Sequence, residues 1–150
     1  MNTSLERSWK KVYASDVEYV AIECRDHLPH HSVLIIEGPL GAGKTTFVKE
    51  FAKDINSSSP SYSVINEYAD VVHADFYRIK ESSEIIHLEL GLYLESRPYL
   101  LIEWGLNHIQ RVANEVPEDF SFFLLEVEIN DAKEGSIESR NYFLKSISEL

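Results

Sequence analysis

The stretch that decides the fold is SVLIIEGPLGAGKTTFVKEFAKDI, residues 32–55. Its first six residues, SVLIIE, form a short run rich in β-branched apolar side chains, which is typical of a buried strand. A glycine-rich turn follows, and from Lys44 the pattern is helical. The apolar positions of this second part share one face: Phe47, Val48, Phe51 and Ile55. A strand, a glycine turn and a helix in this order predict the opening of an α/β unit.

The glycine turn, GPLGAGKT, matches the phosphate-binding pattern G-x-x-x-x-G-K-S/T. Glycines let the backbone turn its N–H groups inward around a phosphate, and the helix that follows directs its N-terminus at the same anion. Lys44 would add a positive charge near the β- and γ-phosphates, and Thr45 a hydroxyl for Mg²⁺. The motif therefore predicts binding of a nucleoside triphosphate with magnesium. The expected binding residues are Gly38, Pro39, Leu40, Gly41, Ala42, Gly43, Lys44, Thr45 and Thr46.

The rest of the chain alternates between strand-like and helix-like segments. We expect helices at 16–28, 81–91 and 105–116, and strands at 62–68, 70–77, 98–104, 120–129 and over the last ten residues. The short link at Ala69-Asp70 predicts an antiparallel hairpin. The predicted fold class is α/β, a P-loop NTPase fold with a mostly parallel central sheet, one antiparallel hairpin and flanking helices. Residues 1–150 are expected to form a single domain, since no linker divides them.

The charge balance bears on possible partners. The chain has 25 acidic and 14 basic residues, a net charge of -11. Proteins that grip nucleic acid by themselves usually present a basic face, so strong direct tRNA binding is not expected. The N-terminus lacks a signal peptide and no apolar run approaches the ~20 residues of a membrane helix, so we expect a cytoplasmic protein without membrane contact. The single cysteine, Cys24, is expected to be a buried, reduced thiol.

Polar side chains follow two of the predicted strands. VVHADFYR ends with Asp75 and Arg78, and LLIEWG ends with Glu103 and Trp104. Ligands of open α/β sheets bind outside the carboxyl ends of the strands, where carboxylates can hold Mg²⁺ or orient water. Asp75 and Glu103 are therefore candidate catalytic residues together with Lys44. Guanine-specific N-K-x-D and D-x-x-G elements are absent, which favours adenine as the base.

Five segments in a fixed order carry a resemblance to a known family: GPLGAGKTTF, SPSYSVINEY, HADFYRI, LELGL and LLIEW. Over about residues 15–105 the chain resembles the bacterial TsaE family (formerly YjeE), the ATPases of tRNA threonylcarbamoyladenosine biosynthesis. The resemblance implies ATP and Mg²⁺ as cofactors. It implies that Thr45 and Glu103 contact the metal and that Asp75 lies near the γ-phosphate. It also implies that Ser61, in the segment SSSPSYS (residues 57–63), belongs to a loop that responds to the nucleotide, where composition alone would suggest a linker.

The same resemblance implies a partner. Members of the family act on a threonylcarbamoyl-transferase heterodimer, TsaB–TsaD, and are thought to reset it between turnovers. The expected function is therefore ATP binding and hydrolysis within the tRNA modification machinery, slow without the partner because few arginines follow the P-loop. Two alternatives stay open: a small-molecule P-loop kinase with Asp75 as base, and a non-catalytic, nucleotide-dependent binding switch.

Overall fold

The computed structural model describes residues 1–53, 63–133 and 135–150. Its strands are β1 (Asn2–Val12), β2 (Ser32–Glu37), β3 (Ile65–Glu67), β4 (Val71–Asp75), β5 (Tyr99–Glu103), β6 (Ser121–Asn130) and β7 (Ser139–Ser148). Its α-helices are α1 (Val17–His27), α2 (Lys44–Ala52), α3 (Leu90–Tyr93) and α4 (Ile109–Glu115). Its 3-10 helices are η1 (Ala14–Asp16), η2 (Ser82–Leu88) and η3 (Leu106–His108). Within these residues no helix is both long and apolar enough to cross a membrane.

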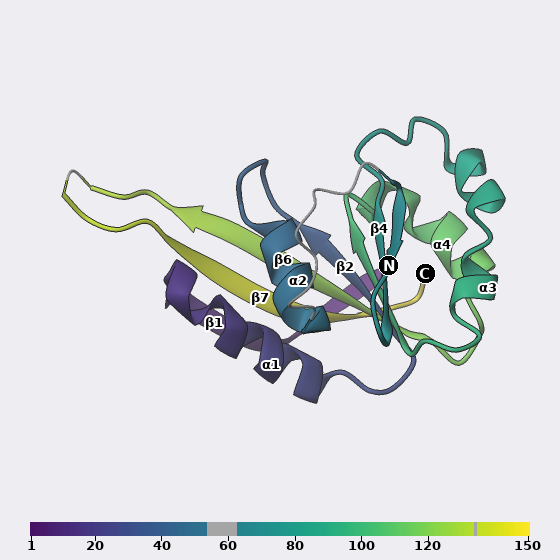
Figure 1. The fold of residues 1–150 in the computed structure, drawn as a ribbon, viewed down its shortest axis with the longest axis horizontal. Helices are drawn as coiled ribbons and strands as arrows, with labels where there is room; N and C mark the ends of the chain where they lie inside the picture. The colour runs from purple at the N-terminus through teal and green to yellow at the C-terminus, as the bar shows by residue number, and fades with distance from the viewer. Residues whose placement is uncertain (54–62, 134) are drawn as a thin grey trace.

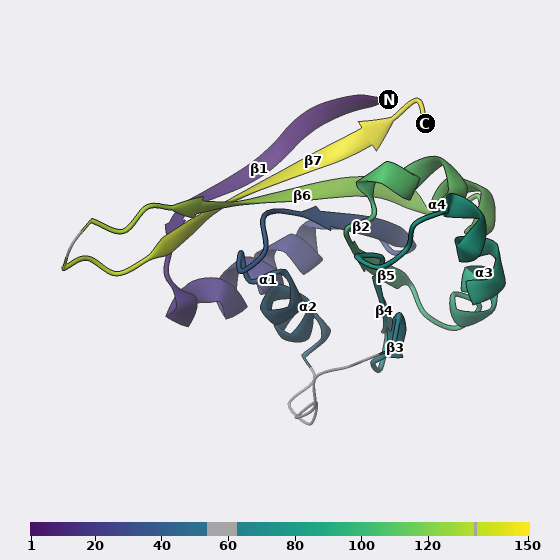
Figure 2. The same cartoon turned by 90° about the horizontal axis from the view of Figure 1, so that it is seen from above.

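The described strands form one mixed sheet in the order β1-β7-β6-β2-β5-β4-β3 (Figures 1 and 2). The four central strands, β6, β2, β5 and β4, run parallel to one another. The strand pairs at both edges of the sheet are antiparallel. At one edge β3 pairs with β4 as the predicted hairpin, and at the other β7 pairs with β6 and β1 pairs with β7. The expectation of a mostly parallel sheet thus holds for the centre, while three of the six strand pairings are antiparallel.

Helices cover the sheet on both faces. On one face α1 and α2 lie side by side, and the other face carries η2, α3 and α4 near β4 and β5 (Figure 2). Two buried clusters follow from this arrangement. One joins α1 and α2 to the sheet through residues such as Phe47, Leu34 and Leu101, and the other joins the remaining helices through residues such as Ile85 and Val112. The expected α/β architecture with flanking helices is confirmed.

Three segments differ from the sequence prediction. The single helix expected at 105–116 is a 3-10 turn, η3, followed by α4. The helix expected at 81–91 is interrupted: η2 ends and α3 begins around Glu89, whose φ of 55° cannot continue a right-handed helix. Its expected cap is present, since Glu81 and Glu84 form a capping box. The strand β1 was not predicted at all. Trp9 and Val12 are its only buried residues, so it lacks the apolar alternation by which strands are recognised.

Candidate functional site

A tight loop joins the end of the central strand β2 to the first residue of α2. Residues 38–43, which we call the glycine loop, contain two residues with left-handed backbone, Gly41 (φ 82°) and Gly43 (φ 91°). Side chains with a Cβ rarely adopt this conformation, which explains why glycine stands at both positions. Gly43 is also the N-cap of α2, so the loop delivers the chain directly to the positive end of the helix dipole.

Lys44, the first residue of α2, is buried against this loop. Its Nζ donates hydrogen bonds to the backbone carbonyl of Gly38 and, at 3.3 Å, to that of Pro39. The same nitrogen lies 3.7 Å from the centroid of the Trp104 ring, an arrangement that a cation favours. These partners are uncharged, so an anion that enters the loop could replace them as the partner of the ammonium group.

The electrostatic surroundings of Lys44 act in two directions. Burial lowers the pKa of its ammonium group, because a low-dielectric environment disfavours the charged form. The carboxylates of Glu103, Glu37 and Asp75 raise the same pKa. Burial is the stronger influence, so the pKa of Lys44 lies below its ordinary value. A lysine with carboxylates close by suits a ligand that combines phosphate with a divalent metal.

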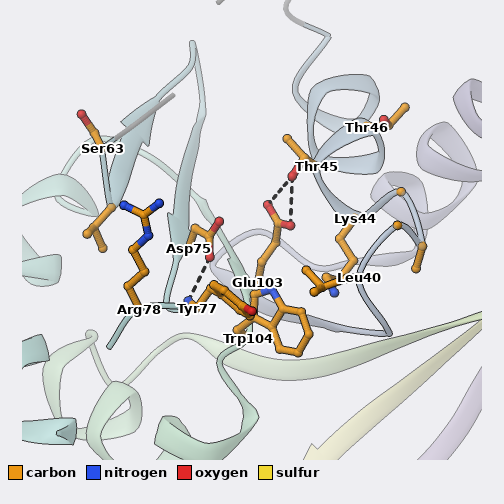
Figure 3. A pocket seen from close by; sticks show the side chains of 14 residues that line it. Leu40, Lys44, Thr45, Thr46, Ser63, Asp75, Tyr77, Arg78, Glu103 and Trp104 are labelled. Carbon is orange, nitrogen blue, oxygen red and sulfur yellow. Dashed lines mark hydrogen bonds between the residues drawn. The ribbon is translucent and has the colours of Figure 1, made fainter. Parts of the chain in front are cut away.

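Thr45 and Glu103 meet directly beside the lysine. The Thr45 hydroxyl lies 3.0 Å from both oxygens of the Glu103 carboxylate, to which it donates (Figure 3). Glu103 Oε2 also lies 2.6 Å from Nε2 of His73, a buried residue of β4. The carboxylate is thus held from two sides, by α2 and by the neighbouring strand. His73 is buried in the sheet, and it contacts a candidate catalytic residue.

Asp75 completes the acidic side of the site. It is the register partner of Glu103 on the adjacent parallel strand, so both carboxylates lie at the carboxyl ends of their strands. Asp75 Oδ1 accepts the backbone N–H of Tyr77 at 3.0 Å, which fixes the carboxylate at the strand end. In Figure 3 Asp75 and Arg78 stand on one side, Thr45 and Lys44 on the other, with Glu103 between them.

These residues share a cavity of about 460 Å³, a size typical of small-ligand sites. The lining residues are Leu40, Gly41, Ala42, Gly43, Lys44, Thr45, Thr46, Ser63, Val64, Asp75, Tyr77, Arg78, Glu103 and Trp104. Every predicted site residue outside the serine segment is therefore placed at the cavity or next to it. Gly38 and Pro39 do not line it, but their carbonyls accept from Lys44. Ser61 lies outside the described residues, as does the rest of its expected loop except Ser63, which lines the cavity.

The oxygen ligands at this site suit a magnesium ion that is bound together with phosphate. In the part of the chain that the structure describes, they do not form a metal site built from protein side chains alone. Within the described residues, no group of three or more His, Cys, Asp or Glu side chains is placed to hold a metal ion. Mg²⁺ is usually bound through one or two protein oxygens, with phosphates and waters completing the octahedron. The Thr45 hydroxyl and the Glu103 carboxylate, with Asp75 nearby, offer hard oxygen ligands of this kind.

One residue that contacts the glycine loop without lining the cavity was not predicted from the sequence. Arg140 of β7 donates to the backbone carbonyls of Gly41 and Ala42. No local motif marks it, because the contact spans 98 residues and depends on the register of the C-terminal strands. Arg78, by contrast, was singled out at the strand end. It lines the cavity, and it has no ion-pair or hydrogen-bond partner in the part of the chain that the structure describes.

Comparison with known proteins gives a consistent result. Residues 13–140 match the family model described as "Threonylcarbamoyl adenosine biosynthesis protein TsaE". The chain is 36% identical over 107 residues to the tRNA threonylcarbamoyladenosine biosynthesis protein TsaE of Bacillus subtilis, covering 65% of each chain. It is 34% identical over 110 residues to the protein of the same name from Nostoc, covering 63% of this chain and 67% of that one. The matched region thus spans about two thirds of the length of these relatives.

Proposed function

This chain belongs to the TsaE family of threonylcarbamoyl adenosine biosynthesis proteins, and from that we propose that it is the ATP-binding and ATP-hydrolysing component of the tRNA threonylcarbamoyladenosine machinery. The observation that carries the proposal is the meeting of Thr45 and Glu103, 3.0 Å apart, at the start of the helix that follows the glycine loop. A hydroxyl and a carboxylate at this point are what a P-loop ATPase needs to hold Mg²⁺ on a triphosphate.

The residues of the chain have separate tasks in this proposal. Backbone N–H groups of the glycine loop bind the phosphates, and Lys44 exchanges the carbonyls of Gly38 and Pro39 for phosphate oxygens. Thr45 and Glu103, which now hydrogen-bond to each other, would hold the metal. When bound, Mg²⁺ neutralises charge on the β- and γ-phosphates. Asp75, at the strand end beside Glu103, orients the attacking water.

The proposal includes a partner. Among the described residues that line the cavity, the cations are Lys44 and Arg78. A group supplied in trans to stabilise the transition state can be worth ~10³–10⁵ in rate. We therefore propose slow hydrolysis by the isolated chain and faster hydrolysis with a threonylcarbamoyl-transferase heterodimer of the TsaB–TsaD type. The net charge of -11 supports tRNA contact through that partner rather than through this chain.

The test measures release of labelled γ-phosphate to water, with the chain alone and with the partner complex. We expect slow release alone, acceleration by the partner and loss of release in Glu103→Ala. Glu128→Ala is the matched control, since Glu128 is an exposed carboxylate on β6 away from the cavity. Fast hydrolysis that the partner leaves unchanged would contradict the proposed mechanism. Transfer of the label to a metabolite would establish a kinase instead.

A second measurement separates hydrolysis from a binding switch. We expect tRNA from cells that lack the chain to lose threonylcarbamoyladenosine, and Glu103→Ala to fail to restore it while Glu128→Ala succeeds. If Glu103→Ala restores the modification while it still binds ATP, hydrolysis is not required and the chain acts as a nucleotide-dependent switch.

A further inference from the structure

Arg140, on the C-terminal strand β7, holds the glycine loop by two hydrogen bonds. Its Nε donates to the carbonyl of Ala42 at 3.0 Å and its Nη2 to the carbonyl of Gly41 at 3.1 Å. Arg140 does not line the cavity, so it contacts the loop from outside the cavity. We propose that Arg140 is a positioning residue that keeps the loop in the shape that receives phosphate. This inference rests on the proposed function of the loop.

The two bonds fix peptide orientation. The described peptide bonds are all trans, and in a trans peptide the C=O and N–H groups point in opposite directions. The bond to Ala42 O therefore directs the N–H of Gly43 away from Arg140. The preceding N–H, that of Ala42, already donates to Pro39 O at 3.1 Å within the loop. Gly43 lines the cavity, so the peptide that Arg140 orients is one whose N–H can serve the ligand.

The Arg140 guanidinium orients the loop through the directions of its hydrogen bonds more than through its positive charge. Its Nη1 forms an ion pair with Glu138 at 2.6 Å and also donates to the carbonyl of Ser139 at 3.4 Å. The positive charge is thus partly balanced on the side away from the loop. A lysine could not reproduce the arrangement, because a single ammonium lacks the planar fork that reaches two successive carbonyls.

The strand that carries Arg140, β7, and its neighbour β6 also contact the two ends of the loop region. At its start, Gly38 packs so closely against β6 that a Cβ there would lie 2.8 Å from Val127 O. Beyond its end, the ring of Phe47 in α2 lies 6.0 Å from that of Tyr142 in β7. The β6–β7 pair therefore supports the loop along its length, with Arg140 at the middle. This gives a role to the C-terminal part of the chain, for which the sequence predicted a strand but no function.

The experiment compares Arg140→Ala and Arg140→Lys with a matched control. Arg97 bonds similarly, with Nε on the carbonyl of Tyr68 at 3.1 Å and Nη1 on Glu67 at 2.8 Å, but it does not line this cavity. Binding of a non-hydrolysable ATP analogue with Mg²⁺ is measured by calorimetry. We expect affinity to fall about tenfold in Arg140→Ala and several-fold in Arg140→Lys, as expected when charge-assisted hydrogen bonds are lost. Arg97→Ala should bind as the unmodified protein does.

Hydrogen exchange without nucleotide supplies a second, independent measurement. In both Arg140 variants the amides of residues 41–44 should exchange several-fold faster, with no such change in Arg97→Ala. Unchanged exchange and unchanged affinity would overturn the positioning role, even if the unfolding midpoint falls. If the unmodified protein binds no nucleotide but the exchange rates respond as expected, the proposed function fails while the positioning role stands. Should Arg140→Ala not fold, Arg140→Lys answers the same question.

Discussion

His73 Nε2 lies 2.6 Å from Glu103 Oε2 in the interior of the sheet, where the two side chains are only 6% and 4% exposed. The other ring nitrogen, His73 Nδ1, is buried without a hydrogen-bond partner in the described part of the chain. The hydrogen bond of the His73 side chain in this part of the chain is therefore the one with Glu103. We infer that His73 orients the Glu103 carboxylate toward Thr45.

Replacing His73 by leucine should separate catalysis from binding. His73→Leu removes one of the two supports of a buried carboxylate, so we expect ATP hydrolysis to fall about tenfold and the free energy of unfolding by about 1–3 kcal/mol. Nucleotide affinity should change little, because the glycine loop and Lys44 are untouched. His73→Gln, whose amide N–H can still reach Glu103, should restore hydrolysis. The control is His87→Leu, because His87 is exposed on η2. Equal loss of ATP hydrolysis in His73→Leu and His73→Gln would contradict the positioning role of His73.

The contact between Lys44 and Trp104 predicts an optical signal of ligand binding. The chain has two tryptophans, and Trp9 is remote, on β1. In a Trp9→Phe protein the emission therefore reports Trp104 alone. If phosphate draws Lys44 Nζ away from its place 3.7 Å from the ring, emission should change on addition of ATP and Mg²⁺. Calorimetry measures nucleotide binding independently of the fluorescence. If calorimetry detects binding and the Trp104 emission does not change, Lys44 keeps its contact with the Trp104 ring.

Gly105, which follows Trp104, should tolerate no side chain. A Cβ at Gly105 would lie 2.6 Å from Ile102 Cγ2, and Ile102 is fully buried in β5, so it cannot move aside. We expect Gly105→Ala to lower the free energy of unfolding by about 1–3 kcal/mol, as overpacking does. In Gly91→Ala the added Cβ would meet only Glu115 O at 3.4 Å, so this variant should be near neutral. Urea unfolding of both variants checks the difference, and equal stability of the two would contradict the packing argument.

The parts of the site that sequence predicted depend on local patterns. The glycine loop and Lys44 follow from one contiguous motif, and Asp75 and Glu103 could be placed together because parallel strands end at the same edge of a sheet. The strand β1 and the Arg140 contact could not be found in this way. The strand β1 depends on pairing between the two ends of the chain, such as Asn2 with Ser148. The Arg140 contact joins residues 98 positions apart, and no short window of sequence contains either pairing. The predicted role of Ser61 remains a prediction, since that residue lies outside the described part.

Cys24 makes a pH-dependent contribution to stability that can be measured separately. Cys24 is fully buried in α1 between the helix and the sheet, and burial raises the pKa of its thiol from 9.0 to about 12. Between these values the unfolded chain loses the thiol proton while the folded chain keeps it. The contribution is therefore complete below pH 9 and declines as the pH rises toward 12, by at most about 1.4 kcal/mol per unit.

The measurement for Cys24 is urea unfolding at pH 8 and pH 10, in the unmodified protein and in Cys24→Ala. Tyrosine ionisation affects both proteins alike, so the difference between them isolates the thiol. We expect the unmodified protein to lose about 1–2 kcal/mol more than Cys24→Ala over this interval. The native thiol should also resist alkylation at pH 8, because it is both protonated and inaccessible. Identical pH dependence in the two proteins would mean that the thiol ionises in the folded state as readily as in the unfolded one.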